Sequence, residues 1–203
     1  MKRVRVMESG GSRALKKHMT IYFWITVLTI FQMLLIPIGL FLLLFVVSQL
    51  YILKRREAPW VPTRKHSVRA LLSLANVRPG ETILDLGCGD GSILFVGARE
   101  FGARGIGYDI NPIILFVGWI RNLFGGVLFR VQLLRGDIFK IKIPQADVVT
   151  LYLFEHVNSK LLPRLREALP KGTRVVTRAF PIKELTPKRT IVFNKETLYL
   201  YEL

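Results

Sequence analysis

The feature that most constrains this chain is a long uncharged apolar run near its N-terminus. Residues 19–53 contain no Asp, Glu, Lys, Arg or His over 35 positions. About 20 apolar residues in a helix cross the hydrocarbon core of a bilayer, and soluble proteins rarely carry such a run. Trp24 and Tyr51, near the two ends, match the aromatic residues that gather at membrane interfaces. We therefore predict a transmembrane segment over residues 19–53.

The run is longer than one upright span requires. At about 1.5 Å per residue, a helix of this length reaches about 52 Å. We favour one long, tilted helix with Pro37 as the point where it would kink. A hairpin that turns at residues 37–39 stays open, although its arms are short for two spans. The distribution of charge does not distinguish a single span from a hairpin, because residues 1–18 and residues 54–69 each carry six Lys or Arg.

The charge of the chain points to an anionic partner. The formal net charge is +16, from 30 basic and 14 acidic residues. Nine basic residues flank the apolar run, and residues 57–203 keep a net charge of +8. Anchoring to anionic lipid accounts for much of this excess, so the bilayer is the expected partner and nucleic acid is the less expected one. One cysteine and three histidines exclude an internal disulfide and make a metal site unexpected.

The remainder of the chain alternates strand and helix signals after Glu57. Such alternation is typical of a doubly wound, Rossmann-like α/β sheet, and two adjacent strands at the end predict an antiparallel edge. The expected elements are helices over 63–77, 92–101, 113–123 and 159–169, strands over 82–86, 104–110, 128–134, 146–154 and 173–180, and a hairpin of 190–194 with 198–201 across Lys195 and Glu196.

A glycine-rich loop follows the first of these strands. Residues 83–92 read ILDLGCGDGS, which predicts a strand, a tight loop and the start of a helix. The glycines Gly87, Gly89 and Gly91 have the spacing G-x-G-x-G, which differs from the dinucleotide fingerprint G-x-G-x-x-G. Asp85 stands directly before the loop, where a carboxylate would repel a pyrophosphate. The motif therefore argues against NAD and for a ligand that carries a cationic amine.

Two further acids follow the next two strands. Asp109 lies 22 residues after Gly87, at a position where an acid accepts hydrogen bonds from ribose hydroxyls. Asp137 precedes Ile138, and such a pair can hold an amino group and pack against a base. Three acids at three successive strand ends predict a nucleoside site without a phosphate clamp.

These residues resemble those of the class I S-adenosylmethionine-dependent methyltransferases, over about residues 62–203. The resemblance implies S-adenosyl-L-methionine as cofactor and a seven-stranded sheet with an antiparallel edge. In that family the acid before the glycine loop faces the amino acid moiety of the cofactor. The acid after the second strand holds the ribose, and the acid after the third strand meets the adenine amine. The implied cofactor-binding residues are Asp85, Gly87, Gly89, Gly91, Asp109, Asp137 and Ile138.

A narrower resemblance is to the membrane-anchored protein-lysine methyltransferases that include the adenine nucleotide translocase and ATP synthase c-subunit enzymes. It implies lysine methylation of a membrane protein, with the predicted divisions 1–18 (basic segment), 19–53 (transmembrane), 54–61 (juxtamembrane linker) and 62–203 (methyltransferase domain). The similar motifs are PWVPTRK at 59–65, GYDINP at 107–112, GDIFK at 136–140, DVVTLYL at 147–153 and RVVTRAF at 174–180.

The resemblance has two departures, and both concern the site. The subgroup tends to have Glu where this chain has Asp109, and its turn after the fourth strand differs from FEHVN at residues 154–158. The second departure leaves the methyl acceptor open. Glu155 and His156 occupy this turn, where a substrate-facing acid or base would sit, so they are the candidate catalytic residues. Cys88 is expected to be a small loop residue and not a nucleophile.

The alternative functions are an RNA or small-molecule methyltransferase and a non-catalytic membrane module with this fold. The Asn-Pro-Pro-aromatic motif of adenine and glutamine methyltransferases is absent after the fourth strand. Because the cofactor is made in the cytoplasm, we expect a single-pass protein with its catalytic domain on that side, in the plasma membrane if the source is prokaryotic. The oligomeric state is left open.

Overall fold

The structure is a computed structural model that describes residues 10–54, 61, 63–127 and 129–203. The chain divides into two compact units between Val47 and Ser48, and each unit is described by itself. The first nine residues of the predicted basic segment and residues 55–60 of the predicted linker lie outside the described residues. The predicted domain boundaries at residues 18, 53 and 61 stay predictions.

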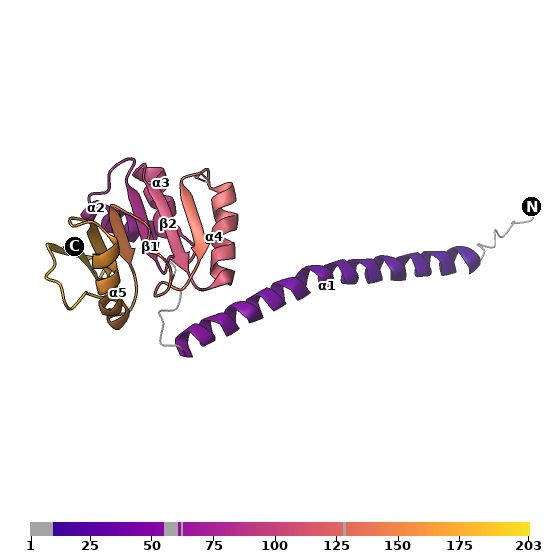
Figure 1. The fold of residues 1–203 in the computed structure, drawn as a ribbon. Coiled ribbons are helices and arrows are strands. Elements are labelled where there is room, and N and C mark those ends of the chain that lie inside the picture. Colours follow the sequence, from indigo (N-terminus) through magenta and orange to yellow (C-terminus); the bar gives the residue numbers. More distant parts are fainter. Residues whose placement is uncertain (1–9, 55–60, 62, 128) are drawn as a thin grey trace, which may run out of the picture. The chain divides into compact units, whose positions relative to one another are not determined.

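The N-terminal apolar run forms one helix, α1, over Gly10–Lys54. The helix continues through Pro37, so the described chain does not make the alternative hairpin (Figure 1). The hydroxyls of Thr26 and Thr29 each donate to a carbonyl four residues earlier at 2.9 Å, which satisfies them without water. An 18-residue window in its part from residue 17 to residue 50 has a mean hydropathy of 2.8, and this part is long and apolar enough, by length and composition, to cross a membrane.

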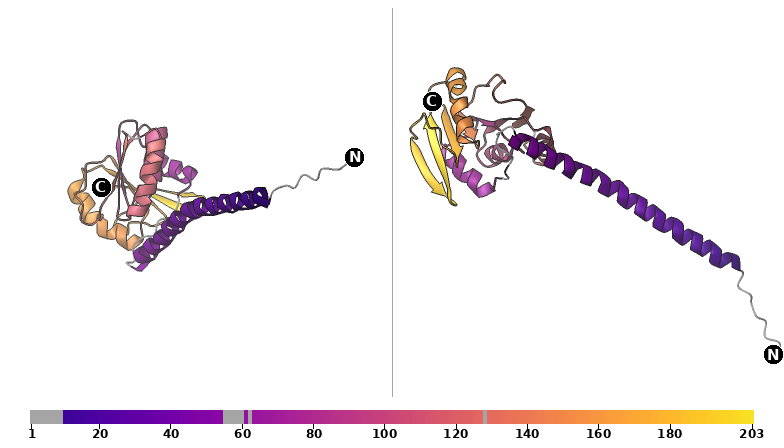
Figure 2. Two further views of the ribbon diagram at one scale, coloured as in Figure 1. Left: turned by 90° about the vertical axis from the view of Figure 1, so that its right-hand side faces the viewer. Right: turned by 90° about the horizontal axis from the view of Figure 1, so that it is seen from below.

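The second unit contains a seven-stranded sheet, as predicted. Its spatial order is β3-β2-β1-β4-β5-β7-β6, and β7 runs antiparallel to both of its neighbours. The yellow C-terminal strands lie at one edge of this unit (Figure 2, right). The last strand of the chain is thus inserted beside β5, and β6 forms the edge. The strands are β1 (Thr82–Leu86), β2 (Arg104–Asp109), β3 (Val131–Arg135), β4 (Val148–Leu151), β5 (Arg174–Arg178), β6 (Arg189–Phe193) and β7 (Glu196–Glu202).

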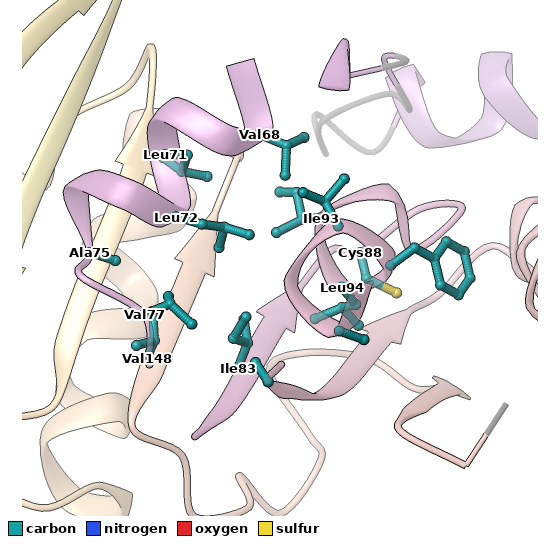
Figure 3. Packing of buried hydrophobic residues seen from close by; sticks show 14 of the residues in the cluster. Val68, Leu71, Leu72, Ala75, Val77, Ile83, Cys88, Ile93, Leu94 and Val148 are labelled. Atoms are coloured by element: carbon teal, nitrogen blue, oxygen red, sulfur yellow. The ribbon is translucent and has the colours of Figure 1, made fainter. Parts of the chain in front are cut away.

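Apolar residues bury both faces of this sheet. Because side chains alternate along a strand, Ile83 packs into one apolar cluster and Leu84 into another. The first cluster contains side chains of α2 (Lys65–Leu74), α3 (Ser92–Glu100) and α4 (Pro112–Phe124), and Figure 3 shows Val68 and Leu72 in it, together with Ile83. The second cluster contains the inner face of α5 (Glu155–Ala168). The doubly wound α/β prediction is confirmed.

Most predicted elements match within a few residues, and the differences have physical reasons. Helix α5 begins four residues before the predicted Ser159 and passes through Pro163. Its buried residues Val157, Leu161 and Leu165 recur every four residues, so packing on the sheet outweighs the cost of an internal proline. The closing hairpin turns one residue earlier than predicted, with φ of 50° and 66° at its two central residues, as a type I′ turn requires.

Candidate active site

A pocket lies at the carboxyl ends of β1 to β4. The chain crosses from β1 to β2 and β3, then returns to place β4 on the other side of β1, and ligands bind at such a switch point in open α/β sheets. The lining residues come from the ends of these four strands, from the segment before α2 and from the starts of α3 and α5, the helices that follow β1 and β4: Val61, Thr63, Asp85, Gly87, Cys88, Gly89, Asp90, Ser92, Ile93, Asp109, Ile110, Asn111, Gly136, Asp137, Ile138, Phe139, Tyr152, Leu153 and Val157.

The glycine loop after β1 is bound tightly to β2. The N–H groups of Gly87 and Cys88 both donate to the carbonyl of Tyr108, at 2.8 and 3.0 Å. Gly87 has a φ of +81°, and a Cβ there would lie 2.7 Å from Leu153 Cδ2, so this position requires glycine. Gly91 differs from the other two glycines, because it is not among the residues that line the pocket. A Cβ at Gly91 would lie 2.8 Å from Leu133 Cδ2, so its lack of a side chain lets the loop approach β3.

Asp85 is the most buried acid of the pocket, with only 2% of its surface exposed. Its Oδ1 accepts a hydrogen bond from the Thr150 hydroxyl on β4 at 2.7 Å, whereas Oδ2 has no hydrogen-bond partner. Loss of solvation raises the pKa of Asp85 to about 7; the Thr150 hydrogen bond opposes this rise, and the charges of Asp109 and Asp90 add to it. The pocket thus contains a buried carboxylate oxygen without a hydrogen-bond donor, and a cationic donor would stabilise it most.

Asp109 is held differently, by backbone groups on both of its oxygens. Its Oδ2 accepts from the N–H of Gly89 and its Oδ1 from the N–H of Asn111, each at 2.8 Å. Burial raises the pKa of Asp109, and these backbone hydrogen bonds oppose the rise. Each carboxylate oxygen retains a lone pair, so Asp109 can still accept hydrogen bonds from neighbouring hydroxyls.

Asp137 and Ile138 come from the loop after β3, and both line the pocket as predicted. Asp137 Oδ1 accepts from the N–H of Phe139 at 2.9 Å, which shapes the turn. Arg164 on α5 donates to the carbonyls of Ile138 and Ile141. The loop is therefore fastened to α5, which keeps an acid and two apolar side chains at the pocket wall.

Sequence reasoning missed the group that builds the β4–β5 side of the pocket. Arg178 on β5 makes two hydrogen bonds to the carboxylate of Glu196, at 2.6 and 2.8 Å, and a third to the hydroxyl of Thr63 at 2.8 Å. Its guanidinium lies 4.3 Å from the centre of the Tyr152 ring, within cation–π range. Thr63 and Tyr152 line the pocket, so Arg178 positions two wall residues. No local pattern in the sequence signals this role, because the partners of Arg178 lie far from it in the chain.

The two predicted catalytic residues are not among those that line the pocket. Glu155 forms an ion pair with Lys183 at 2.6 Å. His156 is exposed and stacks on Phe154, with ring centres 5.9 Å apart. Both lie in the first turn of α5, beyond the end of β4. Their catalytic role stays a prediction that none of their contacts supports.

Cys88 fits its prediction as a small loop residue. It is buried in the apolar cluster of α2 and α3, where Figure 3 shows its side chain. Burial, together with the nearby charges of Asp85 and Asp109, raises the pKa of its thiol. A thiol so protected stays protonated and is a poor nucleophile.

The fold and the pocket together define a class of protein. The strand order with an antiparallel β7, the glycine loop after β1 and the acids at the ends of β1 and β2 are those of the class I S-adenosylmethionine-dependent methyltransferases. The unpartnered Asp85 oxygen fits the cationic amine of this cofactor, and Asp109 fits its ribose hydroxyls.

Comparisons with known proteins agree with this class. Residues 85–189 match the model of the ANTKMT methyltransferase domain family. A protein-lysine N-methyltransferase of Saccharolobus islandicus is 36% identical over 150 residues, which cover 71% of this chain and 93% of that protein. The adenine nucleotide translocase lysine N-methyltransferase of Mus musculus is 29% identical over 150 residues, and the match spans 73% of this chain but 65% of the mouse protein.

A solved structure from Salinibacter ruber, described as an RNA methyltransferase in complex with S-adenosyl-L-homocysteine, is also similar. It shares 40% identity with a TM-score of 0.68, over 70% of this chain and 93% of that one. The chain belongs to the ANTKMT methyltransferase domain family. It is an S-adenosylmethionine-dependent methyltransferase, which confirms the predicted enzyme class and cofactor.

Proposed function

We propose that this enzyme is a membrane-anchored protein-lysine N-methyltransferase whose acceptor is a lysine of a membrane protein. The observation that carries the proposal is an apolar helix of membrane-spanning length directly before a methyltransferase unit. Its relatives in Saccharolobus islandicus and Mus musculus are named as lysine N-methyltransferases, which supports lysine as the acceptor. The alternative of a non-catalytic membrane module is not supported, because the chain belongs to a family of methyltransferases.

We assign the two ends of the cofactor to different acids of the pocket. Asp85, through its unpartnered Oδ2, would bind the amine of the methionine moiety, with Gly87 and Gly89 allowing close approach. Asp109 would accept the ribose hydroxyls, and Asp137 with Ile138 would meet the adenine. S-adenosylmethionine, when bound, supplies an electrophilic methyl group on a sulfonium sulfur.

The chain contributes placement and desolvation to the reaction. Methyl transfer is an in-line displacement, so correct alignment of the amine accounts for much of the rate. The acceptor lysine must first lose a proton from an amine whose ordinary pKa is near 10.4. An apolar wall of Leu153 and Val157 beside Tyr152 would desolvate the ammonium and lower its pKa. Glu155 and His156 are the acid or base predicted from the sequence, but neither lines the pocket, so we assign deprotonation of the amine to desolvation by this wall.

The anchor would keep the active site near the bilayer. Between the end of α1 at Lys54 and the pocket residue Thr63 the chain has nine steps, which reach at most about 32 Å when extended. An enzyme and an acceptor held in one membrane meet at a raised effective concentration. We place the catalytic unit on the cytoplasmic side, in the plasma membrane if the organism is prokaryotic.

Labelled methyl transfer into whole membranes tests this proposal directly. Full-length enzyme with radiolabelled S-adenosylmethionine should label a membrane-protein band, and mass spectrometry of that band should find methyl-lysine. Deletion of residues 1–53 should leave cofactor affinity intact and sharply lower this labelling. Asp85→Asn is the matched control for cofactor dependence. Labelling that is equal with and without residues 1–53 would overturn the membrane-anchored mode.

An RNA methyltransferase is the second candidate, favoured by one comparison and by charge. The Salinibacter ruber structure is described as an RNA methyltransferase, and residues 57–203 carry a net charge of +8. RNA binding that rests on basic side chains weakens steeply with salt. Label that enters RNA extracted from the same cells, with a rate that falls steeply as salt rises, would favour this candidate over protein lysine.

A further inference from the structure

Helix α4 has an apolar surface on both sides, which is unusual for a helix on the outside of an α/β unit. Its inner side packs on the sheet through Ile114, Leu115, Gly118 and Asn122. Its outer side carries large apolar residues where a surface helix in water normally has charged ones. These outer residues, named here the α4 face, are Phe116, Trp119, Ile120, Leu123 and Phe124, with 51, 47, 45, 59 and 83% of their surface exposed.

Contacts between α4 and β3 keep the α4 face pointing away from the sheet. A Cβ on Gly118 would lie 2.6 Å from Leu133 Cδ1, so only a glycine allows this close approach. The Asn122 side-chain amide donates to the carbonyl of Val131 at 3.1 Å, and the Trp119 indole N–H donates to the carbonyl of Leu133 at 2.9 Å. Both bonds fasten α4 to β3. A rotation that buried the α4 face would break them.

Charge near the α4 face favours an anionic partner. From residue 112 to residue 136 the chain contains three arginines and no Asp or Glu. Arg121 forms an ion pair with Asp90 at 2.8 Å, whereas Arg130 and Arg135 are exposed. Trp and Phe side chains beside arginines, without acids, are typical of helices that lie in the headgroup region of a membrane.

We propose that the α4 face is a second membrane contact, which lies in the interfacial region of an anionic bilayer. This inference rests on the membrane anchoring of the proposed function, because a spanning helix holds the catalytic unit within reach of the bilayer. The charge and the exposed aromatic residues favour lipid over a second copy of the chain.

The contact would also orient the active site. Asn111 lines the pocket, and its side-chain oxygen accepts hydrogen bonds from the N–H groups of Ile113 and Ile114 at the start of α4. The pocket wall therefore continues into the first turn of α4, the helix that carries the α4 face. With α4 in the interface, the pocket would lie at the membrane surface, where a lysine close to the bilayer can enter it.

Site-specific labels on the full chain in liposomes test this proposal. Ile120→Cys places a label on the α4 face, and Val192→Cys, at a residue 74% exposed on β6, is the matched control. Cys88 is buried and is the only native cysteine, so each variant presents one exposed thiol. The liposomes are phosphatidylcholine with a minor fraction of phosphatidylglycerol. We expect nitroxide-labelled lipid to quench a fluorophore at 120 and aqueous iodide to be excluded from it, with the reverse at 192.

The other outcomes overturn the proposal in distinguishable ways. Equal iodide quenching at 120 and 192, in a protein that floats with the liposomes, would show an exposed α4 face and leave the anchoring intact. A label at 120 that is shielded from iodide but not quenched by the lipid would indicate a protein occupant, a second copy if the shielding falls on dilution and another part of the chain if it does not. Protein that does not float with the liposomes would overturn the anchoring itself.

A methylation assay tests whether contact between the α4 face and the membrane contributes to catalysis. The double variant Leu123→Gln with Phe124→Gln removes apolar area at the end of α4 away from the pocket. We expect methylation of a membrane acceptor to fall severalfold, with cofactor affinity and the thermal midpoint unchanged. Unchanged methylation of the membrane acceptor would overturn a productive role for the α4 face.

Discussion

The two walls of the pocket are built by different means. On the β1–β2 wall, the Asp109 carboxylate accepts hydrogen bonds from the backbone N–H groups of Gly89 and Asn111, no more than 20 residues away. On the β4–β5 wall, Arg178 reaches Thr63, which is 115 residues distant, and Glu196 on the neighbouring strand. The first wall is thus set by short loops, whereas the second exists only when segments far apart in the chain have met.

This difference indicates how each wall should respond to substitution. A carboxylate in the first wall is costly to bury, and a bound ligand relieves that cost, so changes there should act on affinity and on pH dependence. Arg178 in the second wall joins three elements by side-chain contacts, so changes there should act first on stability.

The largest effect is expected for Arg178→Gln. The substitution breaks an ion pair whose arginine side chain is 7% exposed, and loss of one partner of a buried pair costs about 3 kcal/mol. Denaturant unfolding of the full chain in detergent measures this loss. The matched control is Arg69→Gln, which breaks an exposed pair with Glu100 and should cost less than about 1 kcal/mol. Equal losses for the two variants would show that the β4–β5 wall does not depend on Arg178.

Asp85→Asn is expected to stabilise the ligand-free protein while weakening cofactor binding. The folded pKa of about 7 lies above the ordinary value of 3.8, so the folded state holds its proton more tightly. Its contribution to stability is therefore complete below about pH 4 and is lost as the pH rises through about 7. Asparagine removes this loss and still accepts the Thr150 hydrogen bond.

The free energy of unfolding of Asp85→Asn should exceed that of the parent chain by on the order of 2 kcal/mol at pH 8, with little difference at pH 4. In the parent chain, cofactor affinity should fall as the pH drops below about 7, because protonation removes the charge that faces the amine. Thermal scans at the two pH values and titration calorimetry check both statements. A stability gain of equal size at both pH values would mean that ionisation of Asp85 is not its source.

Asp109→Ala should weaken cofactor binding by more than tenfold. The change removes a charged acceptor from the ribose hydroxyls, and such a hydrogen bond contributes about 1.5–3 kcal/mol. Asp109→Glu is the matched variant, because the related subgroup tends to have Glu here, and it should retain most of the affinity. Titration calorimetry that shows unchanged affinity for the alanine variant would remove the main support for the ribose assignment.

The contrast between the walls also explains what the sequence could predict. Acids and glycines that follow strands identified the first wall, because parallel strands end at one edge of the sheet and bring those residues together. Asp85, Asp109 and Asp137 all line the pocket. Tyr152 and Arg178 carried no local signal, because their contact arises from a strand pairing and from the C-terminal hairpin.

Two further features of the site could not be predicted from the sequence, because they also depend on contacts between distant segments. Gly91 matches the loop spacing, but its close approach to Leu133 on β3 depends on the folded structure and carries no local signal. The sequence predicts Glu155 and His156 as catalytic residues because they follow the fourth strand, yet the direction of their side chains depends on where α5 begins. Packing of α5 on the sheet sets that start, and the local sequence around Pro163 predicted a later one.

The smallest effects are expected for Glu155→Gln and His156→Ala, which test the two predicted catalytic residues outside the pocket lining. A general base contributes about 100-fold or more to a rate. Glu155 instead pairs with Lys183, and this contact raises the pKa of the lysine, while His156 is exposed beside Phe154. We expect each variant to change kcat by less than about threefold, since neither removes a pocket contact. Single-turnover methyl transfer across a pH series checks this, with Asp85→Asn as the control for an affected site. A loss of about 100-fold in kcat with cofactor affinity unchanged would instead establish a catalytic acid or base at the start of α5.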